Sequence, residues 1–183
     1  MSNDPQASDT SEEEEEEDPL IPAFMEVIEE HDAMAAAARL RQMKTMSKQH
    51  AMQVLVYAIL DETEPMAQQF KERAEYFKAY VGEGTEQQQL LLAAVEDFIA
   101  SEAKELMGEM GDYLTALCEA EVVTASVACK WGDLEEPVFG LPPEDVRVSL
   151  CYHVSAADAA SMRAASAQAL KKLRVIAAQE EEE

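Results

Sequence analysis

The sequence predicts an all-α domain of about eight helices, stacked as antiparallel pairs and preceded by a disordered acidic segment. From Leu20 onward the chain is rich in Ala, Leu, Met and Gln, which are good helix formers. Apolar residues recur at spacings of three and four, and the alternating patterns typical of strands are nearly absent. Residues 1–19 differ, since they hold nine acids and no base. A segment with so little apolar surface cannot offset the entropy of ordering, so we expect it to be disordered.

Helical patterns follow one another through the first half of the domain. Apolar residues over 24–31 and the Ala-rich stretch over 36–43 predict one or two short helices. Ser47 is a suitable N-cap for an amphipathic helix over residues 48–61. One further helix is expected to run from residues 63–65 to the turn that begins at Gly82.

The second half of the domain continues the pattern as far as a long loop. Thr85 followed by Gln88 predicts a capping box, so a helix should occupy residues 86–103. A helical pattern then covers residues 113–131. We expect this pattern to be broken near Glu121.

A Pro-rich stretch over residues 132–142 is the one substantial internal loop that the sequence predicts. Pro143 is well placed to begin a helix, and Ser155 with Asp158 opens an Ala-rich helix that continues to the acidic end. The links between helices are short, which favours a HEAT-like stack of helix pairs over a bundle of four long helices. The predicted organisation is a disordered acidic linker over 1–19, a helical domain over 20–179 and an acidic tail over 180–183.

The net charge restricts the partners and the compartment. The chain has 38 acidic and 14 basic residues and a formal net charge of -24. Such a charge repels phosphate backbones and anionic lipid, so we expect no direct binding to nucleic acid or to membranes and favour basic proteins as partners. No apolar run approaches the roughly 20 residues of a membrane span, and the acidic start is the opposite of a signal peptide's basic leader. We therefore expect a cytoplasmic protein.

Motifs for catalysis and for metal binding are missing from the sequence. The three histidines and three cysteines form no metal-ligand spacing and no CxxC pair. No phosphate-binding glycine loop and no nucleophile elbow is present either. We therefore predict that the chain is not an enzyme, that its thiols are reduced, and that it uses no metal and no cofactor.

Two acidic-aromatic patches are the candidate binding sites, over residues 57–64 and 117–131. Carboxylates at the C-terminal end of a helix oppose the helix dipole, which indicates a role other than stability, although a solvated helix end explains them as well. A lone Trp on a helix is more often part of the core than an interface anchor. Together the patches are suited to a Lys-rich partner, because carboxylates pair with ammonium groups and aromatic faces pack on their aliphatic stems. The candidate residues are Tyr57, Asp61, Glu62, Glu64, Glu119, Glu121 and Trp131.

Basic residues also cluster, which predicts a surface of two signs. Four of them fall within ten residues and others follow on a later helix. Ordinary charged helix faces with pairs at i and i+4 are the alternative explanation. The candidate second partner face consists of Arg39, Arg41, Lys44, Lys48, Lys71 and Lys78.

Several stretches resemble one known family. They are the Leu-Asp-Glu-Thr of residues 60–63, the aromatic residues Tyr76, Phe77 and Tyr80, the Gln- and Leu-rich residues 87–99, and the ungapped register from Leu117 to Trp131. These residues resemble the C-terminal HEAT-like domain of eukaryotic translation initiation factor 5, a type shared with the epsilon subunit of initiation factor 2B. The resemblance covers about residues 20–183 and also extends to the acidic ends.

The resemblance implies an adaptor rather than a catalyst. In the factor 5 family, two acidic-aromatic boxes bind lysine-rich blocks in the tail of the initiation factor 2 beta subunit, and other faces contact initiation factors 1 and 3. Carried over to this sequence, the boxes are residues 57–64 and 117–131. The N-terminal GTPase-activating domain of factor 5 has no counterpart among these residues.

The second box departs from the family pattern. Residues 124–126 are Thr, Ala and Ser where three consecutive acids are usual, and Cys118 stands in place of an aromatic residue. Leu173 lies close to the place of a second tryptophan, and the loop after Trp131 is longer by about a dozen residues than is typical of the family. These departures predict a weaker electrostatic attraction at the second box.

We therefore predict a monomeric adaptor that assembles the translation preinitiation complex. Its acidic boxes would bind the tail of the factor 2 beta subunit, and its basic face would bind initiation factors 1 and 3. Two alternatives remain open: the nucleotide-exchange domain of the factor 2B epsilon subunit, and an acidic chaperone for basic proteins whose affinity lies in the tails. Thr10 and Ser11 precede acids at the spacing that acidophilic kinases favour, which makes them candidate phosphorylation sites.

Overall fold

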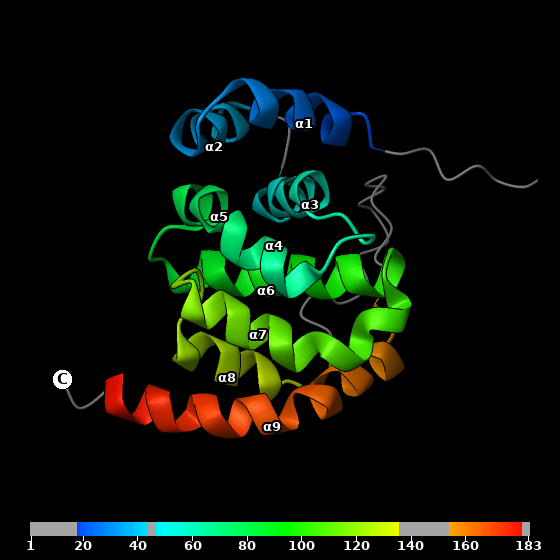
Figure 1. The fold of residues 1–183 in the computed structure, drawn as a ribbon, viewed down its shortest axis with the longest axis vertical. Helices are drawn as coiled ribbons and strands as arrows, with labels where there is room; N and C mark the ends of the chain where they lie inside the picture. The colour runs from blue at the N-terminus through cyan, green and yellow to red at the C-terminus, as the bar shows by residue number, and fades with distance from the viewer. Residues whose placement is uncertain (1–17, 44–46, 136–153, 181–183) are drawn as a thin grey trace, which may run out of the picture.

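A computed structural model describes residues 18–43, 47–135 and 154–180 of the chain (Figure 1). Within these ranges the structure contains helices and no strand. The helices are α1 (Leu20–Glu30), α2 (Ala33–Gln42), α3 (Lys48–Ile59), α4 (Met66–Glu72), α5 (Ala74–Val81), α6 (Thr85–Ser101), the 3₁₀ helix η1 (Lys104–Glu109), α7 (Met110–Glu119), α8 (Ala125–Gly132) and α9 (Ala156–Glu180). The predicted all-α class is confirmed.

The helices form a stack of layers. Figure 1 shows α1 and α2 in blue at one end, then α3 with α5, α4 with α6, α7 with α8, and α9 in orange and red at the other end. Each layer contacts the next: α1 packs on α3, α2 on α5, α3 on α6, α4 on α7, and α9 on both α7 and α8. The apolar faces of these helices merge into one continuous core. The largest wholly buried side chains are Trp131, Tyr113, Phe24, Phe70 and Phe77.

The helix predicted over residues 63–82 is two helices, which corrects the sequence analysis. Arg73 ends α4 and precedes α5, and its backbone leaves the helical region, with φ of -107° and ψ of 15°. The interruption lets the two halves pack in different layers, since α4 contacts α7 whereas α5 contacts α2. Phe70 and Phe77 still meet in the core, with ring centroids 5.9 Å apart. No residue type in the sequence marks this break.

The predicted capping box at the start of α6 is also wrong. The N-cap is Gly84, and Thr85 is already helical. The side chain of Gln88 is buried and accepts a hydrogen bond from the backbone N–H of Thr124, at 2.9 Å. Thr124 is itself the N-cap of α8. Gln88 therefore joins two layers of the stack instead of closing its own helix.

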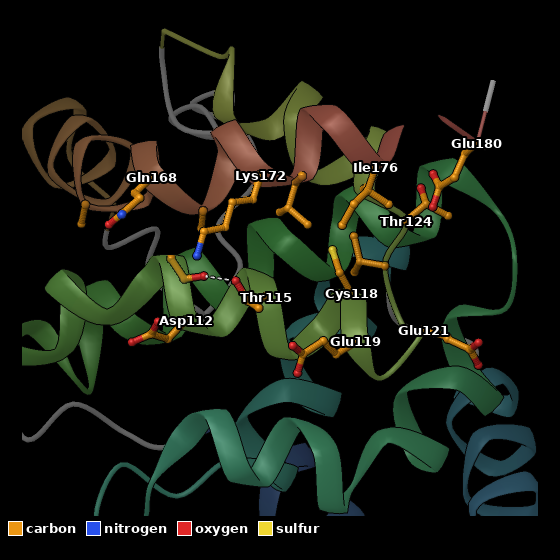
Figure 2. A pocket seen from close by; sticks show the side chains of 16 residues that line it. Asp112, Thr115, Cys118, Glu119, Glu121, Thr124, Gln168, Lys172, Ile176 and Glu180 are labelled. Atoms are coloured by element: carbon orange, nitrogen blue, oxygen red, sulfur yellow. Dashed lines mark hydrogen bonds between the residues drawn. The ribbon is translucent and has the colours of Figure 1, made fainter. Parts of the chain in front are cut away.

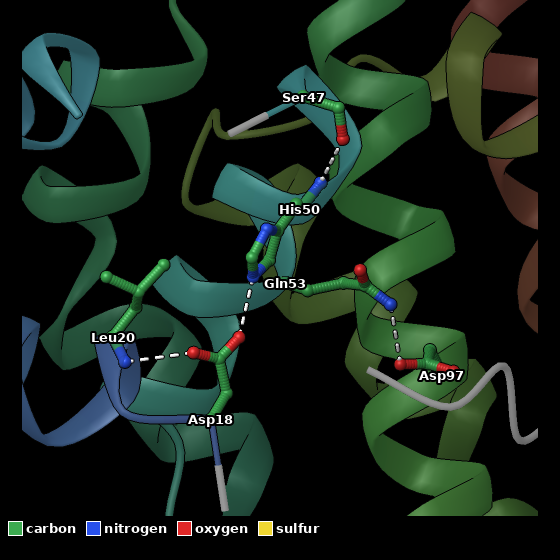
Figure 3. A network of polar contacts seen from close by, with 6 residues as sticks. All are labelled: Asp18, Leu20, Ser47, His50, Gln53 and Asp97. Carbon is green, nitrogen blue, oxygen red and sulfur yellow. Dashed lines mark hydrogen bonds and ion pairs between the residues drawn. The ribbon is translucent and has the colours of Figure 1, made fainter. Parts of the chain in front are cut away.

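Asp18, which the sequence analysis placed in the acidic linker, packs against the helical domain. Asp18 is only 5% exposed, and one of its carboxylate oxygens accepts a hydrogen bond from the N–H of Leu20 at 2.9 Å. The other oxygen lies 2.6 Å from Nε2 of His50 (Figure 3). Ser47 caps α3 as predicted, because its hydroxyl accepts from the N–H of His50. The start of α1 is thus tied to the first turn of α3.

Several predicted features fall on residues that the structure does not describe. They include most of the acidic linker, the helix start at Pro143 and the last three residues of the acidic tail. The long helix predicted after the loop is α9, and Ser155 caps it by accepting from the N–H of Asp158 at 3.0 Å. Among the helices that are described, none is both long enough and apolar enough to cross a membrane.

Candidate functional site

The turn between α3 and α4 presents three of the predicted carboxylates to solvent. Residues 61–65, here termed the acidic loop, are all exposed and include Asp61, Glu62 and Glu64. The carboxylate of Asp61 accepts hydrogen bonds from the hydroxyl of Thr63 at 2.6 Å and from its N–H at 2.8 Å. These bonds lower the pKa of Asp61. The side chain of Gln69 holds the loop from α4, because it bonds both the N–H and the C=O of Asp61.

Tyr57 is not part of this exposed surface, although the sequence placed it in the first box. Its hydroxyl lies 2.6 Å from Oγ of Ser101 and donates to Oδ2 of Asp97 at 3.1 Å. Its ring meets the ring of Phe98 edge to face, with centroids 5.0 Å apart. Burial, followed by the charge of Asp97, raises the pKa of Tyr57 above its ordinary value. The partly buried Tyr57 therefore joins α3 to α6.

The acids of the second box are engaged with the predicted basic face. Oε2 of Glu119 lies 2.6 Å from Nζ of Lys71, and Oε2 of Glu121 lies 3.3 Å from Nζ of Lys78. The four side chains are between 43% and 84% exposed. Exposed pairs of this kind contribute only about 0–1 kcal/mol, so a basic ligand can exchange with Lys71 and Lys78. Two sites that the sequence treated as separate form one surface of alternating charge.

Glu121 has an unusual backbone conformation. Its φ is 56°, and it is the one non-glycine residue with positive φ among those described. The N–H of Glu121 bonds the C=O of Cys118, and the N–H of Val122 bonds the C=O of Leu117, both at 3.0 Å. These two bonds define a Schellman motif at the end of α7, in which the left-handed position is usually glycine. The break that the sequence predicted near Glu121 is confirmed, and an acid occupies the strained position.

Substitution at this position separates strain from charge. We expect Glu121→Gly to be more stable than Glu121→Ala by about 1 kcal/mol, because both lose the carboxylate and only glycine enters the left-handed region without steric cost. Urea denaturation followed by circular dichroism measures the difference. Equal stabilities of the two variants would show that the turn relaxes and that no strain is held at Glu121.

Trp131 lies in the core, and the structure does not present it on the second box. It is 2% exposed, and the guanidinium of Arg163 from α9 lies 4.7 Å from the centre of its ring. Nε of Arg163 donates to the C=O of Trp131 at 3.2 Å, and Nη1 lies 2.9 Å from Oε1 of Glu96. Trp131 thus packs where α6, α8 and α9 meet. The alternative named for a lone Trp, core packing, accounts for this residue.

Two other residues of the predicted basic face have partners of their own. Arg41 donates to the C=O of Ala79 and of Tyr80 at the end of α5, and lies over the ring of Tyr80. Lys48 pairs with Glu86 at 3.2 Å. Arg39 is exposed on α2, whereas Lys44, Thr10 and Ser11 lie outside the described ranges.

The sequence analysis missed a groove between α7 and α9 (Figure 2). Its volume is about 660 Å³. Small residues on both helices leave space for the groove. The signal in the sequence is Gly111 on α7 together with the alanines of α9. The lining consists of Gly111, Asp112, Thr115, Cys118, Glu119, Glu121, Val123, Thr124, Ala125, Ala165, Gln168, Ala169, Lys172, Leu173, Ile176 and Glu180.

The thiol of Cys118, which lines this groove, has low reactivity. Burial, with smaller contributions from Cys129, Glu180 and Glu119, raises the pKa of Cys118 to about 12. The thiol is therefore protonated at neutral pH and behaves as an apolar side chain. Among the described residues no group of three or more His, Cys, Asp or Glu side chains is arranged to hold a metal ion. The arrangement is suited to binding another molecule through charge and apolar contact.

Comparisons with known proteins bear on the fold. No protein-family model matches the sequence, and no curated protein matches it. Among solved structures, the chain is similar to the C-terminal domain of translation initiation factor 5 at low pH, with a TM-score of 0.64 and 16% sequence identity over 91% of this chain and 98% of that chain. The fold is therefore the all-α, HEAT-like fold of the factor 5 C-terminal domain.

Proposed function

We propose that this chain is a protein-interaction domain of translation initiation, which binds the lysine-rich tail of the initiation factor 2 beta subunit. The observation that carries the proposal is the exposed acidic loop on a fold shared with the factor 5 C-terminal domain. The formal net charge of -24 supports a basic partner. In this proposal initiation factors 1 and 3 are further partners, and the protein acts in the cytoplasm as a monomer.

In this proposal the acidic loop and the second box bind one extended segment of the partner. The acidic loop lies directly before the first residue of α4. Lys71, which forms an ion pair with Glu119, lies in the last turn of the same helix. Figure 1 shows the α3–α4 and α7–α8 connections at opposite ends of the α4 and α7 pair. A helix of this length spans about 10 Å, which is the reach of about three or four extended residues. A short lysine block bound at the loop can therefore continue toward Glu119 and Glu121.

The mechanism is electrostatic. The loop carboxylates are exposed and charged, and they lie on a turn that Gln69 and Thr63 hold in place, so little ordering is required when a ligand binds. Charge pairs of this kind accelerate association and are weakened by salt. The less acidic second box gives a smaller contribution, because its two acids must first leave Lys71 and Lys78.

Calorimetric titration of the full chain with a peptide carrying the lysine blocks of the factor 2 beta tail tests the proposal. We expect salt-sensitive binding that falls by about tenfold or more, a loss of at least about 1.4 kcal/mol, when Asp61, Glu62 and Glu64 are all changed to Lys. The matched control changes three exposed acids of α1, Glu26, Glu29 and Glu30, to Lys. This control has the same net charge and should lose much less affinity.

Two outcomes would contradict the adaptor function. Equal losses in both triple variants would mean that net charge alone attracts the peptide. Binding that disappears when Glu12–Glu17 are changed to Gln, and survives in the loop variant, would instead support an acidic chaperone whose tails hold basic proteins.

A further inference from the structure

We propose that the groove between α7 and α9 seats a large apolar side chain of the partner segment, with basic residues of that segment next to it. This inference rests on the proposed function and adds a second, apolar specificity to it. The groove volume of about 660 Å³ lies within the range of about 300–1,000 Å³ typical of ligand sites. It is thus large enough for an aromatic or branched aliphatic side chain.

The walls of the groove show where an apolar side chain would bind. At Gly111 the two helices are in close contact, since a Cβ on this residue would lie 3.3 Å from the C=O of Ala165. Nearer the α7–α8 turn the lining contains the apolar side chains of Cys118, Leu173 and Ile176, with acidic residues at its edge. Ile176 is 46% exposed although it is a large aliphatic residue. A partner's side chain placed here would remove this apolar surface from water.

The charges around the groove indicate what must flank that side chain. Glu119 and Glu180 line the groove together with Cys118, and their charges contribute to the raised pKa of its thiol. Figure 2 shows Glu119, Glu121 and Glu180 around the end of the groove where Cys118 and Ile176 lie. A wholly apolar ligand would desolvate Glu180 and the exposed pairs that Glu119 and Glu121 make with Lys71 and Lys78, which is costly. A ligand with Lys or Arg beside its apolar residue covers the apolar lining and also pairs with the carboxylates.

The opposite end of the groove sets the direction of the segment. Lys172 extends from α9 toward the end of the groove where Asp112 and Thr115 lie, away from Glu180 (Figure 2). At that end a basic residue of the ligand would meet the ammonium group of Lys172 beside the carboxylate of Asp112. At the other end Glu180 attracts it, and Glu119 and Glu121 can exchange Lys71 and Lys78 for it. We therefore expect the lysines of the segment to lie toward the α7–α8 turn. A run of lysines alone would leave the apolar lining uncovered.

The test compares two synthetic peptides on the full chain. In one peptide a single phenylalanine is flanked by pairs of lysines, and in its twin alanine replaces the phenylalanine. Fluorescence anisotropy with labelled peptides should show about tenfold tighter binding of the phenylalanine peptide, since a tenfold ratio requires about 1.4 kcal/mol and burial of an aromatic ring supplies about that much or more. Equal binding of the two peptides would overturn the proposal.

Matched variants locate the binding site. Ile176→Asp places a carboxylate in the apolar part of the lining, whereas Val175→Asp changes a neighbouring exposed residue that does not line the groove. The preference for phenylalanine should be lost in Ile176→Asp and kept in Val175→Asp. Its persistence in Ile176→Asp, with circular dichroism showing a folded chain, would overturn the groove assignment.

The two peptides also distinguish a failure of this inference from a failure of the proposed function. The triple Lys variant of the acidic loop should weaken both peptides by the same factor and leave their ratio unchanged. Lysine-dependent binding without a phenylalanine preference would refute the groove alone. Absence of lysine-dependent binding at any salt concentration would refute the proposed function and with it the groove's role in that function.

Discussion

Replacement of Trp131 by alanine should lower the free energy of unfolding by about 3–5 kcal/mol. The side chain is among the largest of the wholly buried residues, and it lies where α6, α8 and α9 meet. Its loss leaves a cavity and removes the ring on which the guanidinium of Arg163 packs at 4.7 Å. Urea denaturation followed by circular dichroism measures the change, because the variant has no other tryptophan for fluorescence.

Trp131→Phe is the matched control. A phenyl ring fills most of the same space, and the indole N–H has no hydrogen-bond partner among the described residues, so no hydrogen bond is lost. We expect less than half of the destabilisation seen with alanine. A variant Trp131→Ala that keeps wild-type stability and loses peptide binding would show that the ring serves the partner, as the second box would require.

Arg163→Ala should destabilise the domain by about 3–5 kcal/mol, the usual cost of removing one partner of a buried ion pair. Arg163 and Glu96 are 9% and 1% exposed, and their charged groups are 2.9 Å apart. The substitution also removes the hydrogen bond from Nε to the C=O of Trp131. Since Glu96 lies on α6 and Arg163 on α9, the pair fixes the last helix against the middle of the stack.

Arg174→Ala is the control on the same helix. Arg174 pairs with Asp133 at 2.6 Å, but the two side chains are 52% and 65% exposed. Such a pair is worth about 0–1 kcal/mol, so the midpoint of urea denaturation should hardly move. A cycle that combines Arg163→Ala with Glu96→Gln gives the coupling energy. Similar effects of Arg163→Ala and Arg174→Ala would show that the buried pair contributes no more than an exposed one.

Helix positions could be predicted where the signal is local. Ser47 and Ser155 were expected to begin helices, and both hydroxyls accept the capping hydrogen bond. Gly82, with φ of 62°, ends α5 where a turn was expected. These residues act on their own helix, so the sequence is enough to interpret them.

Elements that depend on the neighbouring layer could not be predicted. The break at Arg73 exists because α4 and α5 pack on different helices, and Gln88 bonds a residue 36 positions away in sequence. In the sequence Asp18 is the last residue of an acidic run, but in the structure its carboxylate is bonded to His50 (Figure 3). In each case a distant partner outweighs the local preference of the residue.

The candidate site shows the same division. The sequence by itself singled out Asp61, Glu62 and Glu64, because carboxylates at the C-terminal end of a helix oppose its dipole, and all three are exposed in the structure. It also determined the all-α class, since the period of the apolar residues depends only on their order along the chain. Only the tertiary structure paired Glu119 and Glu121 with Lys71 and Lys78, buried Trp131 under Arg163, and opened a groove between α7 and α9. These features depend on which helices become neighbours, and that is set by packing across the whole core.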